Sequence, residues 1–304
     1  MIINNLKKLK NNLNSRDLSI YLFHGVIKKK PNSSNVRNYN LKHIDQKKFE
    51  KYIKYLSEHG KAITLNEIEK NKGDFFKKYI ITFDDGFHNN YKYALPILKK
   101  YKIPHIIYLT TNYVDKNLIS WIDRIDIAIN NNKKKFIYSS ILSKRFRLDN
   151  RKNKIYFLNF VRNYCKSLRD TDLNKFAEIL LKDIKLNSPK SSNSDLDKKL
   201  SWKHVKKMSK NGLSEFGAHS HNHNILGHLK EAQYKKEILI SLKTLLKKAN
   251  IKTKHYSYPE GFKTSFNNQI IKFLKKNKIK TAVTTLLPKE NKNSLFKLNR
   301  FFVI

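Results

Sequence analysis

Two adjacent carboxylates, Asp84 and Asp85, follow directly on an apolar and β-branched run in the stretch YIITFDDG (79–86). Carboxylates this close raise each other's proton affinity, and at the end of a buried strand they are poorly solvated. The pair therefore destabilises the fold unless an opposite charge compensates it. We expect a cation to bind at this strand end.

A second group of candidate residues lies in FGAHSHNH (216–223), where His219 and His223 are four positions apart. A helical turn there would place both imidazoles on one face. Two histidines and one carboxylate make a nitrogen and oxygen donor set suited to Zn²⁺, with open positions for water and substrate. One carboxylate of the acidic pair would then be a ligand, and the other would stay free. Either histidine alone is better explained as a hydrogen-bonded residue, so the prediction depends on the joint pattern.

Short apolar runs alternate along the chain with amphipathic stretches of helical period, which predicts an α/β fold with a mainly parallel sheet or barrel. In such folds ligands bind beyond the carboxyl ends of the strands, so the acidic pair and the histidines should converge on one rim. We expect strands at 19–26, 79–86, 105–111, 214–220, 255–261 and 281–285, and helices at 47–60, 89–102, 200–212 and 230–249, with a last helix ending at Lys278.

The alternation is interrupted between about residues 125 and 199 by Lys- and Asn-rich sequence with helical stretches such as NKIYFLNFVRNYCKSL. This region predicts a helical insertion, and its end, 187–199, predicts an exposed linker. We therefore expect an N-terminal extension at 1–18 and a catalytic domain at 19–304 that carries the insertion.

Composition limits the classes of protein that the chain can belong to. The 304 residues, 39% of them apolar, are enough for one large domain with a substantial core. The 64 Lys and Arg against 24 Asp and Glu give a net charge of +40, which invites a nucleic-acid or anionic-membrane hypothesis, but the lysines are spread through nearly every segment. Cys165 is the only cysteine, so no internal disulfide can form. No signal-peptide core or membrane-spanning run is recognised, so a cytoplasmic location is the default expectation, and export by an unrecognised route is the alternative.

The motifs TFDDG (82–86), HSHNH (219–223) and SYPEG (257–261) resemble, in order and spacing, those of the polysaccharide deacetylases of carbohydrate esterase family 4, also called the NodB-homology domain. LFHGV (22–26) and ISWIDRI (119–125) are similar to flanking segments of the same family. The resemblance covers residues 19–304 apart from most of the insertion. It implies a distorted barrel of about seven βα units, a divalent metal ion, with Zn²⁺ as the expected ion, and hydrolysis of an N-acetyl group on a sugar.

The resemblance also implies residue roles. Asp84 would be the general base, and Asp85, His219 and His223 would be the metal ligands. The family's late histidine, its usual general acid, has no counterpart, because no histidine follows His255.

Two histidines near the acidic pair are candidates for the missing acid, since histidine titrates near neutral pH. His24 ends the first predicted strand on the same rim, and it either protonates the leaving amine or only hydrogen-bonds Asp84 or the neighbouring loop. His88 is the next candidate.

The third motif and the tryptophan segment supply the remaining candidates. A backbone N–H of the loop from Tyr258 to Glu260 would hold the oxyanion, and Pro259 would fix the path of that loop. Glu260 stands where the family often has a tyrosine. Trp121 either stacks on a sugar ring or lies in the core.

The favoured hypothesis is a metal-dependent hydrolase that removes N-acetyl groups from a polysaccharide, oligosaccharide or glycan precursor. Its partner would be the glycan, with no specific nucleic acid and no membrane span. One alternative is a catalytically weak relative that binds glycan without turnover, because the late histidine is missing. The other is a polyanion- or nucleic-acid-binding protein, which is suggested only by net charge.

Overall fold

The computed structural model of the chain describes residues 2–3, 6–15, 17–28, 31–32, 34–68, 74–285 and 294–304. Its main element is a sheet in which every strand pairing is parallel. All residues of the central strands β2 and β7 are buried, as expected where a parallel sheet is covered on both faces. The strands are β1 (Ile2–Ile3), β2 (Ser19–Phe23), β5 (Lys61–Ala62), β6 (Lys78–Phe83), β7 (His105–Leu109), β10 (Ser214–Ala218), β11 (His255–Ser257), β12 (Thr281–Thr284), β13 (Leu298–Asn299) and β14 (Phe301–Val303).

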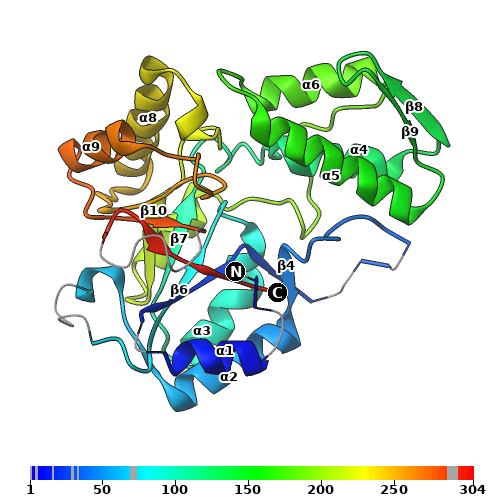
Figure 1. The fold of residues 1–304 in the computed structure, drawn as a ribbon. Helices are drawn as coiled ribbons and strands as arrows, with labels where there is room; N and C mark the ends of the chain where they lie inside the picture. The colour runs from blue at the N-terminus through cyan, green and yellow to red at the C-terminus, as the bar shows by residue number, and fades with distance from the viewer. Residues whose placement is uncertain are drawn as a thin grey trace.

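The C-terminal segment closes this sheet into a barrel. β13 pairs with β12, and β14, one residue further along, pairs with β2 and β1. The ring therefore runs β2, β6, β7, β10, β11, β12 and then through β13 to β14. Both termini lie beside each other as a result (Figure 1). The expected α/β barrel is confirmed, although the sequence pattern did not predict the closing strands.

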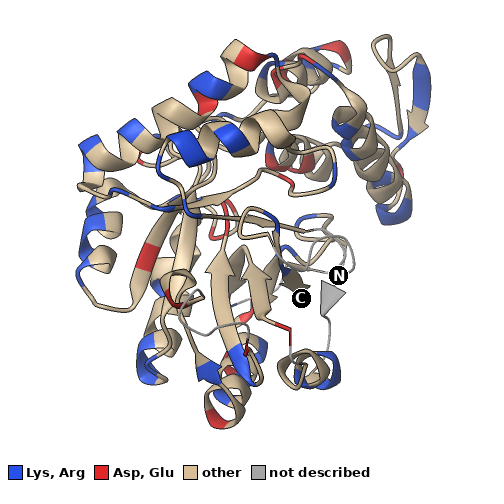
Figure 2. Ribbon diagram, turned by 60° about the vertical axis from the view of Figure 1, so that its left-hand side comes forward, with Lys and Arg blue, Asp and Glu red and all other residues tan. Residues whose placement is uncertain are grey.

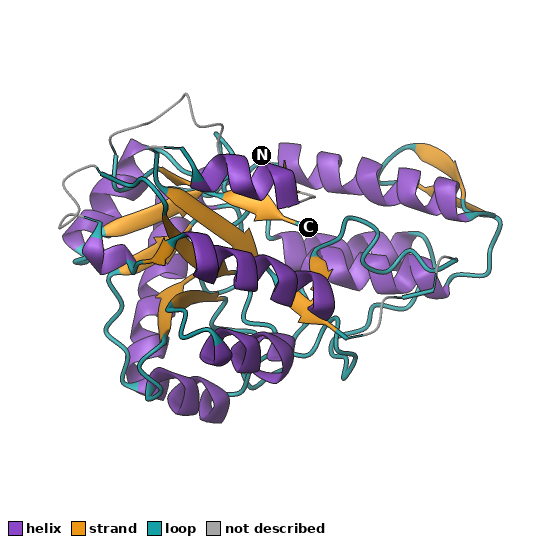
Figure 3. Ribbon diagram, turned by 90° about the horizontal axis from the view of Figure 1, so that it is seen from below, coloured by secondary structure: helices purple, strands orange, loops and turns teal. Residues whose placement is uncertain are grey.

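Amphipathic helices cover the outside of the barrel (Figure 3). α2 illustrates why they form: the Asp45 side chain accepts the Lys48 backbone N–H at its start, and an apolar stripe that includes Phe49 and Ile53 is buried. The expected helix at 89–102 begins with a π-helical turn at Asn90–Ala94. The helices are α1 (Leu6–Leu13), α2 (Gln46–His59), α3 (Leu95–Lys100), α7 (Trp202–Ser209), α8 (Glu231–Ala249) and α9 (Asn268–Lys276).

Residues 121–186 form a lobe beside the barrel, here called the insertion lobe (Figure 1). Its buried side chains, together with Val36 and Ile225, form a hydrophobic cluster that is separate from the barrel core. It is not wholly helical, because β8 and β9 form an antiparallel hairpin, and it starts a few residues before the expected boundary. Its elements are α4 (Trp121–Asn131), β8 (Phe136–Ser139), β9 (Lys144–Arg147), α5 (Arg151–Ser167) and α6 (Leu173–Asp183).

The expected exposed linker at 187–199 is wrong at its end. Asp197 and Lys199 are only 1% and 4% exposed. The reason is a return contact with the barrel: Lys199 forms a β-bridge with Phe87, and Leu200 N–H donates to Gly86 O. This stretch therefore packs directly behind the acidic pair.

Lys and Arg residues occur on helices in all parts of the fold (Figure 2). This distribution agrees with a compositional bias spread through the chain. Within the residues that the structure describes, no helix combines the length and apolar character needed to cross a bilayer.

Candidate active site

A pocket of about 380 Å³ opens at the carboxyl ends of the barrel strands. The sequence-predicted residues converge on it: Asp84 and Asp85 follow β6, His24 follows β2, and His219 and His223 follow β10. The prediction that these strand ends share one rim is confirmed.

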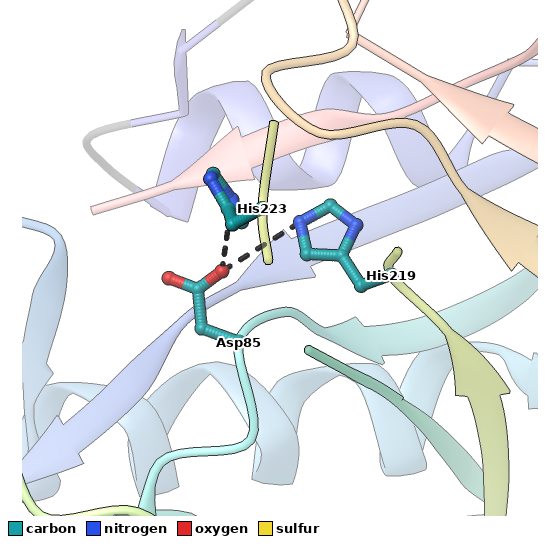
Figure 4. A group of neighbouring side chains, drawn as sticks. All are labelled: Asp85, His219 and His223. Carbon is teal, nitrogen blue, oxygen red and sulfur yellow. Dashed lines mark ion pairs between the residues drawn. The ribbon is translucent and has the colours of Figure 1, made fainter. Parts of the chain in front are cut away.

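Asp85 and the two histidines form a compact donor set (Figure 4). The Oδ1 atom of Asp85 lies 3.2 Å from His223 Nε2 and 3.6 Å from His219 Nε2. The same Oδ1 is buried and has no hydrogen-bond partner among the described residues. An unpartnered buried carboxylate oxygen that faces two imidazoles fits a bound divalent cation, and the nitrogen and oxygen donors suit Zn²⁺.

The two imidazoles present their Nε2 atoms to this position. His219 Nδ1 donates to the carbonyl oxygen of Ser257 at 2.8 Å, which leaves the lone pair on Nε2. Burial lowers the pKa of His219, so the ring is neutral at pH 7. Burial opposes protonation of His223 as well, but the Asp85 carboxylate outweighs it and raises the pKa of His223.

The chain does not form a helical turn between His219 and His223. Ser220 and His223 have φ values of +59° and +60°, which no helix tolerates. The Ser220 hydroxyl accepts the backbone N–H of His223 at 2.9 Å, and Glu237 of α8 accepts the backbone N–H groups of residues 221–222. A loop tied to α8 therefore brings the imidazoles together.

The chain turns sharply after β6, and this turn separates the two carboxylates. Asp85 and Gly86 have φ values of +69° and +70°. At Gly86 a Cβ atom would come within 2.7 Å of Leu109 Cδ2, and together with the positive φ this contact favours glycine. A positive φ at Asp85 costs on the order of 1–3 kcal/mol, a cost that functional sites commonly carry.

Asp84 is bound by a residue that sequence reasoning missed. Arg300, between β13 and β14 and 1% exposed, makes two parallel hydrogen bonds of 2.7 Å, from Nη1 to Oδ1 and from Nη2 to Oδ2 of Asp84. Burial acts to raise the pKa of Asp84, but the guanidinium outweighs it and lowers the pKa, so Asp84 is ionised at neutral pH. The available signal was an arginine near the end of a lysine-rich chain, since Arg suits bidentate carboxylate pairs.

His24 lines the pocket and packs edge-to-face on Phe302, with ring centroids 5.3 Å apart. Its Nδ1 atom is buried and has no hydrogen-bond partner among the described residues, so this atom does not tie the ring to Asp84 or to the neighbouring loop. Burial lowers the pKa of His24 to about 4. His88 lies outside this pocket against His204, with centroids 4.9 Å apart, and is excluded as the acid.

The third motif offers one free donor to the pocket. Tyr258 N–H donates to Val283 O at 3.4 Å, and Pro259 has no N–H. Within the described part of the chain, the N–H of Glu260 is the remaining donor of this loop and has no acceptor. Trp121 is fully buried in the core of the insertion lobe, so its assignment to sugar stacking is wrong.

The polysaccharide deacetylase family model matches residues 72–282. Poly-beta-1,6-N-acetyl-D-glucosamine N-deacetylase from Staphylococcus aureus is 39% identical over 97 residues, which cover 31% of this chain and 32% of that protein. The protein of the same name from Staphylococcus epidermidis is 36% identical over 121 residues, covering 36% and 40%. The chain thus matches only about a third of the length of these relatives.

Solved structures extend the likeness over nearly the whole chain. The deacetylase PplD from Streptococcus pyogenes has a TM-score of 0.57 at 17% identity, covering 94% of this chain and 92% of that one. IcaB from Ammonifex degensii has a TM-score of 0.56 at 16% identity, covering 96% and 93%. At these identities the likeness concerns the fold. Because the family model spans more than half of its residues, the chain belongs to the polysaccharide deacetylase family.

Proposed function

We propose that this protein is a metal-dependent hydrolase that removes N-acetyl groups from an N-acetylated glycan. The observation that carries the proposal is the split acidic pair, with Asp84 bound by Arg300 and Asp85 facing two imidazoles in one pocket. The names of the staphylococcal relatives make β-1,6-linked N-acetylglucosamine oligomers the first substrates to test.

Asp85, His219 and His223 would hold the ion, which supplies Lewis-acid polarisation of the acetyl carbonyl and of the attacking water. Asp84 accepts a proton from that water as the water oxygen bonds to the carbonyl carbon. The Glu260 N–H is the donor available to the developing oxyanion. The C–N bond then breaks, and one proton must reach the amine to give acetate and a free amino sugar.

The route of this last proton depends on His24. With a pKa of about 4, its ring is neutral at pH 7 and must take up a proton before it can give one. The proton that Asp84 removed is available, either through His24 or by direct return from Asp84. Relay through His24 predicts that His24→Gln lowers kcat by about 10²-fold with metal retained, whereas direct return leaves kcat within about threefold.

Acetate release from β-1,6-linked N-acetylglucosamine oligomers tests the function. We expect turnover with Zn²⁺, loss of turnover after chelation, and recovery when the ion is returned. His219→Ala/His223→Ala should lose both the bound metal and the activity, while Asp170→Asn, an exposed carboxylate outside the pocket, should behave like the parent protein.

Glycan binding without acetate release, across substrates of several linkages, would contradict the hydrolase and favour the alternative of a binding protein. Stoichiometric metal in the double histidine variant would contradict the ligand assignment.

A further inference from the structure

Lys42 belongs to none of the motifs above, yet its ammonium group lies in the active-site pocket between two carboxylates. Its Nζ is 3.2 Å from Asp85 Oδ2 and 2.9 Å from Asp123 Oδ2. The three side chains are 14%, 4% and 9% exposed, so these ion pairs are shielded from solvent. Shielded pairs of this kind hold their geometry far better than surface pairs do.

The insertion lobe fixes this lysine in place. Asp123 lies in the first turn of α4, and its Oδ2 accepts the hydroxyl of Ser120, the N-cap of that helix, at 2.7 Å. Lys42 also lies over the ring of Phe87, with Nζ 4.7 Å from the centroid. Burial acts to lower the pKa of Lys42, but the two carboxylates outweigh it and raise the pKa, so the group is a permanent cation.

The two oxygens of Asp85 consequently have different partners. Oδ2 is taken by Lys42, whereas Oδ1 has no hydrogen-bond partner among the described residues and faces the histidines. We propose that Lys42 is a positioning residue: its ammonium group binds Oδ2, so that Asp85 offers only Oδ1 to the metal ion. On the proposed function, the position thereby kept open is the one that water and the acetyl oxygen need.

A second lysine nearby provides a matched control. Lys199 is 4% exposed and lies over the same Phe87 ring, with Nζ 3.4 Å from the centroid. Its Nζ has no hydrogen-bond partner among the described residues, in contrast to Lys42. Lys199→Met therefore removes a buried positive charge from the same neighbourhood without releasing an oxygen of Asp85.

The visible absorption of the Co²⁺-loaded protein tests this directly, because it weakens when the number of ligands around Co²⁺ rises. We expect Lys42→Met to weaken the absorption, since Oδ2 becomes free to bind the ion, while Lys42→Arg and Lys199→Met keep the parent spectrum. At saturating Zn²⁺, Lys42→Met should lower kcat by about 10–100-fold. The Zn²⁺ affinity of this variant should change less than its kcat. Loss of the Lys42 contact to Asp85 weakens the orientation of a ligand, whereas loss of the lysine charge removes a repulsion on the cation, and these two effects oppose each other.

An unchanged Co²⁺ spectrum in Lys42→Met would overturn the proposal, as would activity that saturating Zn²⁺ fully restores. If that variant does not fold, as judged by thermal unfolding, Asp123→Asn loosens Lys42 and should shift the spectrum in the same direction. The spectrum needs no substrate. A spectral shift in a protein that releases no acetate would uphold the role of Lys42 and contradict the proposed function alone.

Discussion

One buried carboxylate of the barrel and one of the insertion lobe are partnered in opposite ways. In the barrel the buried carboxylate Asp84 is fully paired, with Arg300 on both of its oxygens. In the lobe the buried carboxylate of Asp126 has an Oδ1 without a partner among the described residues. Burial, only partly offset by Arg162, raises the pKa of Asp126 to about 7. On the proposed function, the chemistry at the barrel rim would use a carboxylate that is kept ionised, whereas the lobe contains one that is easily neutralised.

The lobe nevertheless reaches the pocket with a few side chains. Arg162 and Lys166 of α5 line it, and Asp123 of α4 holds Lys42. The barrel supplies the groups that would react, and the lobe supplies groups that shape and restrain the rim. This division of labour can be tested one pair of variants at a time.

The largest expected effect on activity comes from replacing the buried aspartates with asparagine, one at a time. Asp84→Asn should lower activity by about 10²–10⁴-fold with metal retained, because the proton acceptor is lost. Asp126→Asn should keep activity, and Asp85→Asn should lose metal as well as turnover. Acetate release and metal content of the purified variants decide the matter. Equal metal content in the Asp84 and Asp85 variants would contradict the division of roles.

The second-largest effect is expected on stability, when the ion pair between Arg300 and Asp84 is broken. Arg300→Met leaves Asp84 buried and uncompensated, which costs about 3–5 kcal/mol. In the lobe, Arg147→Met breaks an exposed pair with Asp149 and should cost no more than about 1 kcal/mol. Denaturant unfolding measures both. Comparable losses in the two variants would mean that the barrel pair is not specially important.

Lowering the pH should decrease the stability of the barrel against unfolding and increase that of the lobe. Burial lowers the pKa of His105 in the barrel to about 4, so between pH 6.5 and 4 the unfolded chain binds a proton that the folded one does not, and stability falls as pH falls. The pKa of Asp126 is raised to about 7, so between about pH 4 and pH 7 the folded protein binds a proton that the unfolded chain does not. The stability that this proton gives the folded state is therefore present at low pH and is lost as the pH rises towards 7. At most, the effect amounts to about 3 kcal/mol for His105 and about 4 kcal/mol for Asp126.

Hydrogen exchange at pH 5 and pH 7.5, corrected for the intrinsic rate, resolves the two regions. His105→Gln should flatten the pH dependence of the barrel, and Asp126→Asn that of the lobe. Parallel pH trends in both regions of the parent protein would contradict the assignment.

The smallest effect is expected from a second ion pair between the two regions, in addition to Lys42 with Asp123. Lys166 of the lobe lies 2.8 Å from Glu260 of the barrel loop, and its side chain is 33% exposed. Lys166→Gln should change the free energy of unfolding by less than about 1 kcal/mol, because partly solvated pairs contribute little. Lys152→Gln, exposed on the same helix, is the control. A loss of unfolding free energy well above that of the control would contradict this expectation and show that the pair stabilises the contact between lobe and barrel.

Local pattern was enough to determine the fold class and the principal candidates. Apolar runs and helical periods are properties of short windows, so the strands around 79–86 and 105–111 and the helix around 47–60 were predicted within a few residues. Parallel strands end on one rim, which is why the carboxylates of the first motif and the histidines of the second could be placed together.

Tertiary structure alone decided how these groups are partnered. Arg300 and Asp84 are 216 positions apart and meet only because the C-terminal segment closes the barrel. The non-helical loop at 219–223 depends on Glu237 of helix α8, and the burial of Trp121 depends on packing within the lobe. Short windows of sequence determine which elements form, but charge pairing and burial depend on which elements come together, because both are set by contacts between distant segments.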